Sequence, residues 1–198
     1  HPPPVRKRAP AVLPELITYD AAAPRLSWPE AVAALRDGHR RPEARIADMV
    51  VGPADATLLS RSAFIEGLGY GMKAVTVLDR NAAAGFPTVQ GAMFVFEPAH
   101  GRLEAIIDSR LVTEFKTAAD SVLGALSLAR PDSARLLIVG AGTVARSLVE
   151  AYLALFPALE RVTIWARRPE QSAALARAFG GARVPVVPAA DLRAAVAE

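Results

Sequence analysis

The stretch Leu136-Leu137-Ile138-Val139-Gly140-Ala141-Gly142-Thr143-Val144-Ala145 decides the fold. Its first four residues form a continuous apolar run, which is typical of a strand buried in a parallel sheet. The next six read GxGxxA, in which the first glycine permits a tight turn and the second lets a diphosphate approach the backbone. A small sixth residue allows close packing of helix on strand. The stretch therefore predicts a strand, a turn and a helix whose N-terminus binds a nicotinamide dinucleotide. A glycine-rich turn without a ligand is the alternative.

Strands and helices alternate around this turn. Thr117, with Asp120 three residues later, predicts the capped start of a helix that ends before Pro131. The hydrophobic pattern then predicts a strand over 135–139, a helix over 142–155, a strand over 161–165, a helix over 170–179, a strand over 184–187 and a helix from Asp191. Such alternation is typical of a doubly wound parallel sheet, here cut off after three strands.

The residues before this region follow another pattern. Residues 1–14 are rich in proline and predict an extended arm, residues 16–19 predict a short strand, and Ser27 predicts the cap of a helix over 30–36. Short strands are expected over 73–78, 91–96 and 103–107, with a hairpin turn at 98–102. The predicted fold class is thus α/β, with a truncated Rossmann-type sheet preceded by an α+β domain that holds an antiparallel sheet. The expected boundary separates an N-terminal domain, 1–132, from an incomplete NAD(P)-binding domain, 133–198; the resemblance described below implies that the first is a substrate and dimerisation domain.

Composition excludes several classes of protein. The 198 residues include no cysteine, which removes disulfides and thiolate metal sites, and no carboxylate or histidine cluster suggests a metal. The net charge of +3 is small and the arginines are scattered, so we expect no nucleic-acid partner. No apolar run approaches the length of about 18 residues that spans a bilayer, and the N-terminus does not resemble a signal peptide. A cytoplasmic location is the default expectation.

The end of the second parallel strand bears on the choice of cofactor. Proteins that bind NAD usually place a carboxylate there for the ribose hydroxyls, but this chain has Trp165-Ala166-Arg167-Arg168. Arg167 and Arg168 can pair with a 2′-phosphate, so we predict that NADP(H) is preferred and that NAD(H) is possible. The alternative is that both arginines are solvated charges at the entry to a helix.

Lysine is rare in this chain. Lys and Arg together number 23, of which only Lys7, Lys73 and Lys116 are lysine. Because an ammonium group is compact and its proton affinity responds to its surroundings, each internal lysine suggests a specific role. Lys73 and Lys116 are therefore candidate site residues, against the alternative that they are solvated charges.

Five motifs in order resemble the ornithine cyclodeaminase/mu-crystallin family over about residues 30–198. They are Gly71-Met72-Lys73, Gly85-Phe86-Pro87-Thr88-Val89-Gln90-Gly91, Thr113-Glu114-Phe115-Lys116-Thr117-Ala118-Ala119, Ala129-Arg130-Pro131-Asp132-Ser133 and Gly140-Ala141-Gly142. The resemblance implies a Rossmann domain paired with an antiparallel dimerisation domain, and hence a homodimer. It also implies a small amino or imino acid as substrate.

The resemblance also implies the residues of the site. In the family, three basic residues hold the substrate carboxylate at the nicotinamide. Lys73 matches one of them, Lys116 stands where most members have Arg, and Arg45 is a looser match to the third. Thr88 matches a pocket threonine. The implied cofactor-binding residues are Thr117, Gly140, Ala141, Gly142, Thr143, Val144, Ala145, Arg167 and Arg168.

Three functions follow from these expectations. The first is an NAD(P)-dependent oxidoreductase that acts at the α-carbon of an amino or imino acid, as a ketimine reductase of the pyrroline-2-carboxylate type. In this reading Lys73 and Lys116 hold the carboxylate and transfer a proton to the imine nitrogen. The second is ornithine cyclodeaminase, which converts ornithine to proline and ammonia and recycles its cofactor. The third is a non-catalytic protein that binds NADP(H) or another ligand, as mu-crystallin partly is.

Overall fold

The computed structural model describes residues 13–197, which form two compact units. The sheet unit contains residues 13–19 and 44–109, and the helix-rich unit contains residues 20–43 and 110–197. This division differs from the boundary expected at residue 132. The helices over 28–39 and 109–128 precede the parallel strands in sequence, but they pack in the same core as the helix over 143–155, which follows the first parallel strand. Residues 1–12 of the expected N-terminal arm lie outside the described residues.

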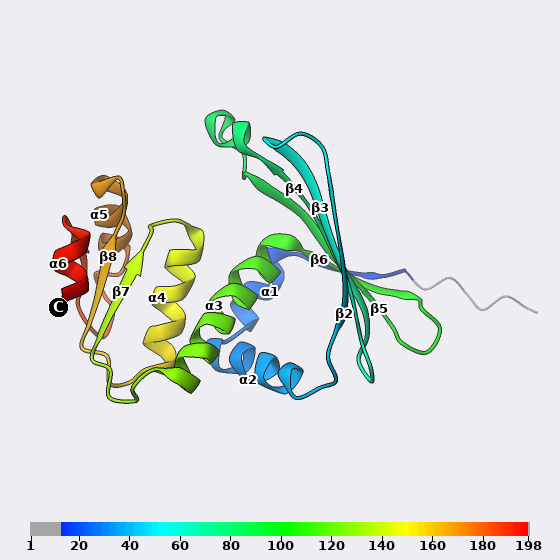
Figure 1. The fold of residues 1–198 in the computed structure, drawn as a ribbon, viewed down its shortest axis with the longest axis horizontal. Helices are drawn as coiled ribbons and strands as arrows, with labels where there is room; N and C mark the ends of the chain where they lie inside the picture. The colour runs from blue at the N-terminus through cyan, green and yellow to red at the C-terminus, as the bar shows by residue number, and fades with distance from the viewer. Residues whose placement is uncertain (1–12, 198) are drawn as a thin grey trace, which may run out of the picture. The chain divides into compact units, whose positions relative to one another are not determined.

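The sheet unit is built on six strands in the order β1-β6-β5-β4-β3-β2 (Figure 1). The strands are β1 Glu15–Ile17, β2 Arg45–Val51, β3 Ala56–Ile65, β4 Gly69–Leu78, β5 Val89–Phe96 and β6 Leu103–Asp108. All neighbouring pairs from β2 to β6 are antiparallel, as predicted. The short β1 adds a parallel pair with β6, which the sequence pattern did not indicate. A 3₁₀ helix, η2 Asp79–Ala84, connects β4 with β5.

The expected hairpin turn between β5 and β6 is confirmed, and one carboxylate organises it. Glu97 accepts hydrogen bonds from the backbone N–H groups of Ala99, His100 and Arg102 at 3.0, 2.8 and 3.2 Å. Desolvation raises the pKa of Glu97, but these N–H donors outweigh it and leave the pKa below its ordinary value. The charge of Glu97 therefore stabilises the turn.

The helix-rich unit contains a parallel sheet of three strands in the order β7-β8-β9. The strands are β7 Arg135–Val139, β8 Arg161–Trp165 and β9 Val186–Ala189. The longer helices of the unit are α2 Trp28–His39, α3 Ser109–Leu128, α4 Thr143–Leu155, α5 Pro169–Ala178 and α6 Leu192–Ala197, and α1 Tyr19–Ala22 and η1 Ala23–Arg25 are short. The strand order matches one half of a doubly wound dinucleotide-binding fold, so the predicted fold class is confirmed.

Two predicted helix starts are confirmed and one is wrong. The Ser27 hydroxyl oxygen accepts from the N–H of Glu30, and the Asp191 carboxylate accepts from the N–H of Ala194 at 2.7 Å. Thr117, in contrast, lies in the middle of α3, which begins eight residues earlier at Ser109. The residues before and after Thr117 are both helical, so the backbone N–H groups near it bond within the helix and none is left for its side chain to cap.

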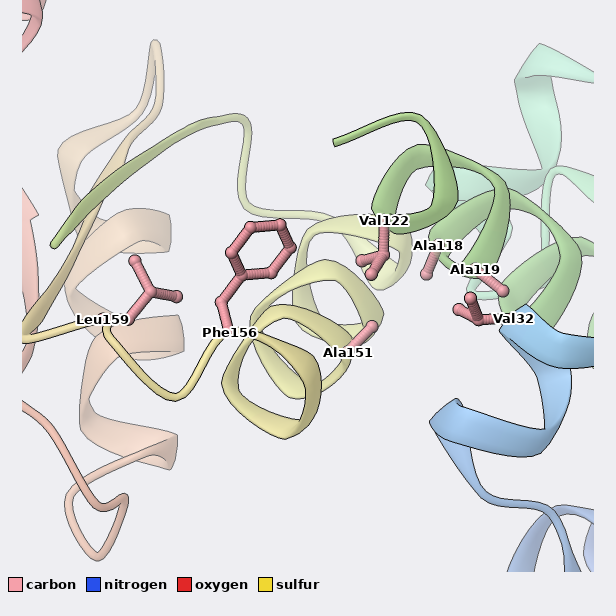
Figure 2. Packing of buried hydrophobic residues seen from close by; sticks show 7 residues of the cluster. All are labelled: Val32, Ala118, Ala119, Val122, Ala151, Phe156 and Leu159. Carbon is pink, nitrogen blue, oxygen red and sulfur yellow. The ribbon is translucent and has the colours of Figure 1, made fainter. Parts of the chain in front are cut away.

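The core of the helix-rich unit has two parts. In the first, side chains of α2, α3 and α4 pack together, and Figure 2 shows the buried members Val32, Ala118, Ala119, Val122, Ala151, Phe156 and Leu159. In the second, α4 and α5 cover β7 and β8 through Ile138, Ala145, Val149, Val162, Ile164, Leu175 and Ala176. Helix α4 contributes to both parts, which anchors its N-terminal end beside β7.

Candidate functional site

The glycine-rich turn after β7 has the predicted strand–turn–helix form. Gly140 has a φ of +124°, a backbone conformation that side chains disfavour, and its N–H donates to the Trp165 carbonyl at 2.7 Å. Helix α4 begins at Thr143 with Gly142 as its N-cap, and no side chain caps its first N–H groups. The positive end of α4 therefore offers unsatisfied donors at the end of β7, of which only Ile138 is buried, in contrast to the fully buried strand that its apolar sequence predicts.

The space around this turn is open. A Cβ atom added at Gly140 or Gly142 would meet no heavy atom within 4 Å, and Gly142 and Thr143 are exposed. Ala145 is buried against β7 and β8, as expected for the small residue of the motif, while Ala141 and Val144 are half-buried. The N–H groups of residues 143–145 can thus hold a diphosphate without displacing protein atoms.

Arg167 and Arg168 follow β8, whose last residue is hydrogen-bonded to the glycine turn. Both arginines are exposed, and Arg168 is the N-cap of α5 without forming a side-chain cap. No carboxylate occurs between Trp165 and Arg168. The carboxyl end of β8 is therefore followed by basic side chains, at the position where an Asp or Glu usually binds the ribose hydroxyls.

The strand register places Lys73 and Arg45 on opposite faces of the six-stranded sheet. Arg45 pairs with Phe64 and Phe64 with Tyr70, so these three side chains share one face. Lys73 lies three residues after Tyr70 on β4, and side chains an odd number of residues apart on a strand point to opposite faces. The Arg45 guanidinium lies 6.0 Å from the centre of the Phe64 ring. A pocket of about 380 Å³ opens on that face beside Arg45, Phe64 and Tyr70. The structure thus does not bring Arg45 and Lys73 together.

Thr88 lies immediately before β5 and is half-buried. Its carbonyl accepts a hydrogen bond from the N–H of Leu78 at 2.9 Å, which closes the connection between β4 and β5. In that connection the Asn81 side chain donates to the Pro87 carbonyl at 3.0 Å. These contacts hold the predicted pocket threonine in an ordered loop.

Lys116 and Thr117 lie on α3, in the helix-rich unit. The exposed Lys116 ammonium donates to Asp120 at 2.7 Å, and His39 lies 3.6 Å from the same carboxylate. The hydrogen bond from Lys116 holds the pKa of Asp120 below its usual value. The carbonyl of Thr117 accepts from the Ser121 hydroxyl at 2.9 Å. Lys116 and Lys73 belong to different units.

One charged group on the sheet was missed by sequence reasoning. The guanidinium of Arg61 forms two hydrogen bonds with Asp48, from Nε at 2.7 Å and from Nη2 at 2.5 Å. Asp48, Arg61 and Lys73 are consecutive partners across β2, β3 and β4, so their side chains share one face. Only the pairing of the strands reveals this row, because its members are 12 or more residues apart in sequence.

Residues 13–197 contain neither a membrane-spanning helix nor a metal-binding cluster. No helix in this range is both long and apolar enough to cross a bilayer. No group of three or more histidine, aspartate or glutamate side chains within it has the arrangement of a metal site.

Comparison with known proteins agrees with the fold. The model of the ornithine cyclodeaminase/mu-crystallin family matches residues 55–198. The chain is 60% identical over 185 residues to Delta(1)-pyrroline-2-carboxylate reductase of Paracoccus denitrificans, which is 93% of this chain and 58% of that protein.

Two solved structures share the fold. Thermococcus litoralis Delta(1)-pyrroline-2-carboxylate reductase, solved with NADH and L-proline, has a TM-score of 0.80 at 20% identity and covers 91% of this chain and 58% of its own. An archaeal alanine dehydrogenase dimer with bound NAD has a TM-score of 0.83 at 22% identity, over 92% of this chain and 57% of its own. The chain thus spans less than two thirds of each of the three proteins.

Proposed function

We propose that this chain, which belongs to the ornithine cyclodeaminase/mu-crystallin family, is part of an NADPH-dependent reductase that converts Δ1-pyrroline-2-carboxylate to proline. The observation that carries the proposal is the 60% identity to the Paracoccus denitrificans reductase across 93% of the chain. The uncapped N-terminus of α4 and its open glycine turn supply the cofactor site that such a reductase needs.

In this proposal the turn from Gly140 to Ala145 holds the cofactor diphosphate through backbone N–H groups. When bound, the reduced nicotinamide supplies the hydride that the imine carbon accepts. The imine nitrogen must gain a proton in the same reaction, and Lys73 is our candidate for the group that provides it. Lys73 and Thr88 bind the substrate. The roles of Lys116 and Arg45 stay predictions, since Lys116 belongs to the other unit and Arg45 lies on the other face of the sheet from Lys73.

The preference for NADPH rests on Arg167 and Arg168. Both guanidinium groups are exposed at the carboxyl edge of β8 and can pair with the 2′-phosphate. Replacing both by glutamine should weaken NADPH binding by about tenfold or more and change NADH binding by less than about threefold. Fluorescence titration with each cofactor measures both constants. Tighter binding of NADH than of NADPH by the unaltered protein would contradict the preference.

The reaction is tested by following the absorbance of NADPH with pyrroline-2-carboxylate, piperideine-2-carboxylate, alanine, arginine and ornithine. Ornithine also needs an assay of proline or ammonia, because cyclodeamination consumes no cofactor. Turnover of ornithine alone would favour a cyclodeaminase, and bound NADPH without any turnover would favour a binding protein.

Lys73→Ala tests the site within the same assay. We expect the variant to lose reduction while its NADPH affinity stays nearly unchanged. Arg130→Gln is the control, because Arg130 is an exposed residue paired only locally with Asp132. Full activity of the Lys73 variant would refute the assignment.

We also infer a homodimer in the cytoplasm. The dimer follows from the family and from the similar fold of the alanine dehydrogenase dimer. The cytoplasm is where a reductase finds its pool of reduced cofactor. Sedimentation equilibrium and cell fractionation test the two inferences, and a monomer or an exported protein would contradict them.

A further inference from the structure

A row of three charges crosses one face of the six-stranded sheet. Asp48 on β2 is the register partner of Arg61 on β3, and Arg61 is the register partner of Lys73 on β4. Directly opposed residues of antiparallel strands have Cβ atoms only about 5 Å apart. The row therefore places two formal positive charges and one negative charge side by side, with a cation at the Lys73 end.

Asp48 holds the Arg61 guanidinium by one edge. It accepts from Nε at 2.7 Å and from Nη2 at 2.5 Å, which is the paired geometry that fixes the plane of a guanidinium. A guanidinium has five N–H donors, so this pair leaves three for other acceptors. The remaining Nη1–Nη2 edge is a second fork of the shape that fits a carboxylate. The Arg61 side chain is 63% exposed, so a ligand can reach it.

The nearest register neighbours of Arg61 and Lys73 along their own strands are uncharged. By the same register, the positions before and after the row on β3 and β4 are Ala63 with Gly71 and Leu59 with Val75. The next strand presents Met93 directly opposite Lys73. The Met93 methyl group lies over Gly71, 3.3 Å from the position that a Cβ atom would take there, so an apolar side chain borders the charged row.

We propose that Arg61 is a substrate-binding residue that receives the carboxylate of the imino acid together with Lys73, and that Asp48 is a positioning residue that orients Arg61. This inference rests on the proposed reductase function, and it deepens it by naming the second cation on the Lys73 face. Arg45 does not share this face, as described above. The pairing selects substrates with a carboxylate next to the imine carbon.

The test compares Arg61→Gln with the parent protein, with Asp48→Asn and with Arg61→Lys. The control is Arg130→Gln, which breaks another exposed two-bond Arg–Asp pair, that of Arg130 with Asp132. The substrates are pyrroline-2-carboxylate and 1-pyrroline, which has the same ring without the carboxylate. Binding of pyrrole-2-carboxylate to the protein with NADP⁺ is measured by calorimetry, and thermal melting verifies that each variant is folded.

We expect Arg61→Gln to raise KM for pyrroline-2-carboxylate and Kd for pyrrole-2-carboxylate by about 10- to 100-fold, with kcat changed by less than about threefold. Its kcat/KM for 1-pyrroline should stay within about twofold of the parent's. Asp48→Asn should raise KM by about three- to tenfold, and Arg61→Lys should recover part of the loss. Arg130→Gln should match the parent.

Equal KM and Kd in Arg61→Gln and Arg130→Gln would overturn the proposal. So would an equal loss of activity toward 1-pyrroline, since that would show a role unrelated to the carboxylate. If the parent binds pyrrole-2-carboxylate through Arg61 but reduces no imine, the proposed function fails and Arg61 stands. If the parent reduces pyrroline-2-carboxylate and Arg61→Gln does so equally well, Arg61 fails and the function stands. A parent that neither binds nor reduces these compounds contradicts both.

Discussion

Replacing Arg183 should destabilise the helix-rich unit, because this side chain closes the carbonyl end of α4. Its guanidinium donates to four backbone carbonyls in the last turn of the helix and in the residues that follow it. These acceptors are Leu153 at 3.1 Å, Phe156 at 2.5 Å, Pro157 at 3.4 Å and Leu159 at 3.0 Å. The positive charge also complements the negative end of the helix dipole. Arg183→Met keeps most of the aliphatic stem and removes every donor.

The magnitude follows from these distances. Hydrogen bonds from a charged donor contribute about 1.5–3 kcal/mol each to stability, and three of the four are 3.1 Å or shorter. Water can replace part of the hydrogen bonding that is lost, because Arg183 is an exposed residue and the carbonyls at a helix end are accessible to solvent. We therefore expect a loss of about 2–3 kcal/mol in the free energy of unfolding, which is at the upper end for single substitutions. Arg183→Lys should lose less, since it retains a charge at the helix end.

Equilibrium urea unfolding measures this loss. Trp28 and Trp165, the two tryptophans of the chain, both lie in the helix-rich unit, so their fluorescence reports its unfolding. With a slope of about 2 kcal/mol per molar urea, the midpoint should fall by about 1–1.5 M. Arg193→Met, at an exposed position of α6, is the control and should change the unfolding free energy by less than about 0.5 kcal/mol. Equal midpoints for the two variants would refute the reasoning.

Three further predictions follow from the helix-rich unit. Gly140→Ala should cost about 1–3 kcal/mol of stability, because the φ of +124° disfavours any side chain, and it should weaken NADPH binding; an unchanged melting temperature and titration curve would contradict this. Thr117→Ala should change the unfolding free energy in urea by less than about 0.5 kcal/mol, since Thr117 lies inside α3; a loss of about 1 kcal/mol or more would indicate a cap after all. Desolvation, with a smaller contribution from the charge of Glu114, raises the pKa of Glu150 above its ordinary value of 4.5 despite the opposing charge of Arg146. A carboxyl group whose pKa is higher in the folded than in the unfolded state contributes stability at pH values below its unfolded pKa, and this contribution is lost as the pH rises through the folded pKa. Glutamine has no such titration, so Glu150→Gln should become more stable relative to the parent from pH 4.5 upward. Thermal melts of both proteins from pH 4 to 8 measure the difference, and a constant offset would contradict it.

Much of the helix-rich unit was predictable from local sequence. Strands 135–139 and 161–165 have the predicted bounds, and Ser27 and Asp191 cap helices as expected. These features depend on contacts between residues close in the chain, so their patterns are visible without a structure. The predicted start of α3 was wrong because Thr117-x-x-Asp120 resembles a capping box, although the helix already begins at Ser109.

The sequence by itself determined the dinucleotide turn of residues 140–145, the basic edge after β8 and the order of strands and helices around them. Each of these is specified by neighbouring residues, through backbone conformation, hydrophobic period or helix capping. Only the tertiary structure decided that α2 and α3 share a core with α4, that Arg45 and Lys73 lie on opposite faces, and that Asp48, Arg61 and Lys73 form one row. The physical reason is register: a shift of one residue in strand pairing moves every side chain to the other face, and that pairing joins segments far apart in the chain.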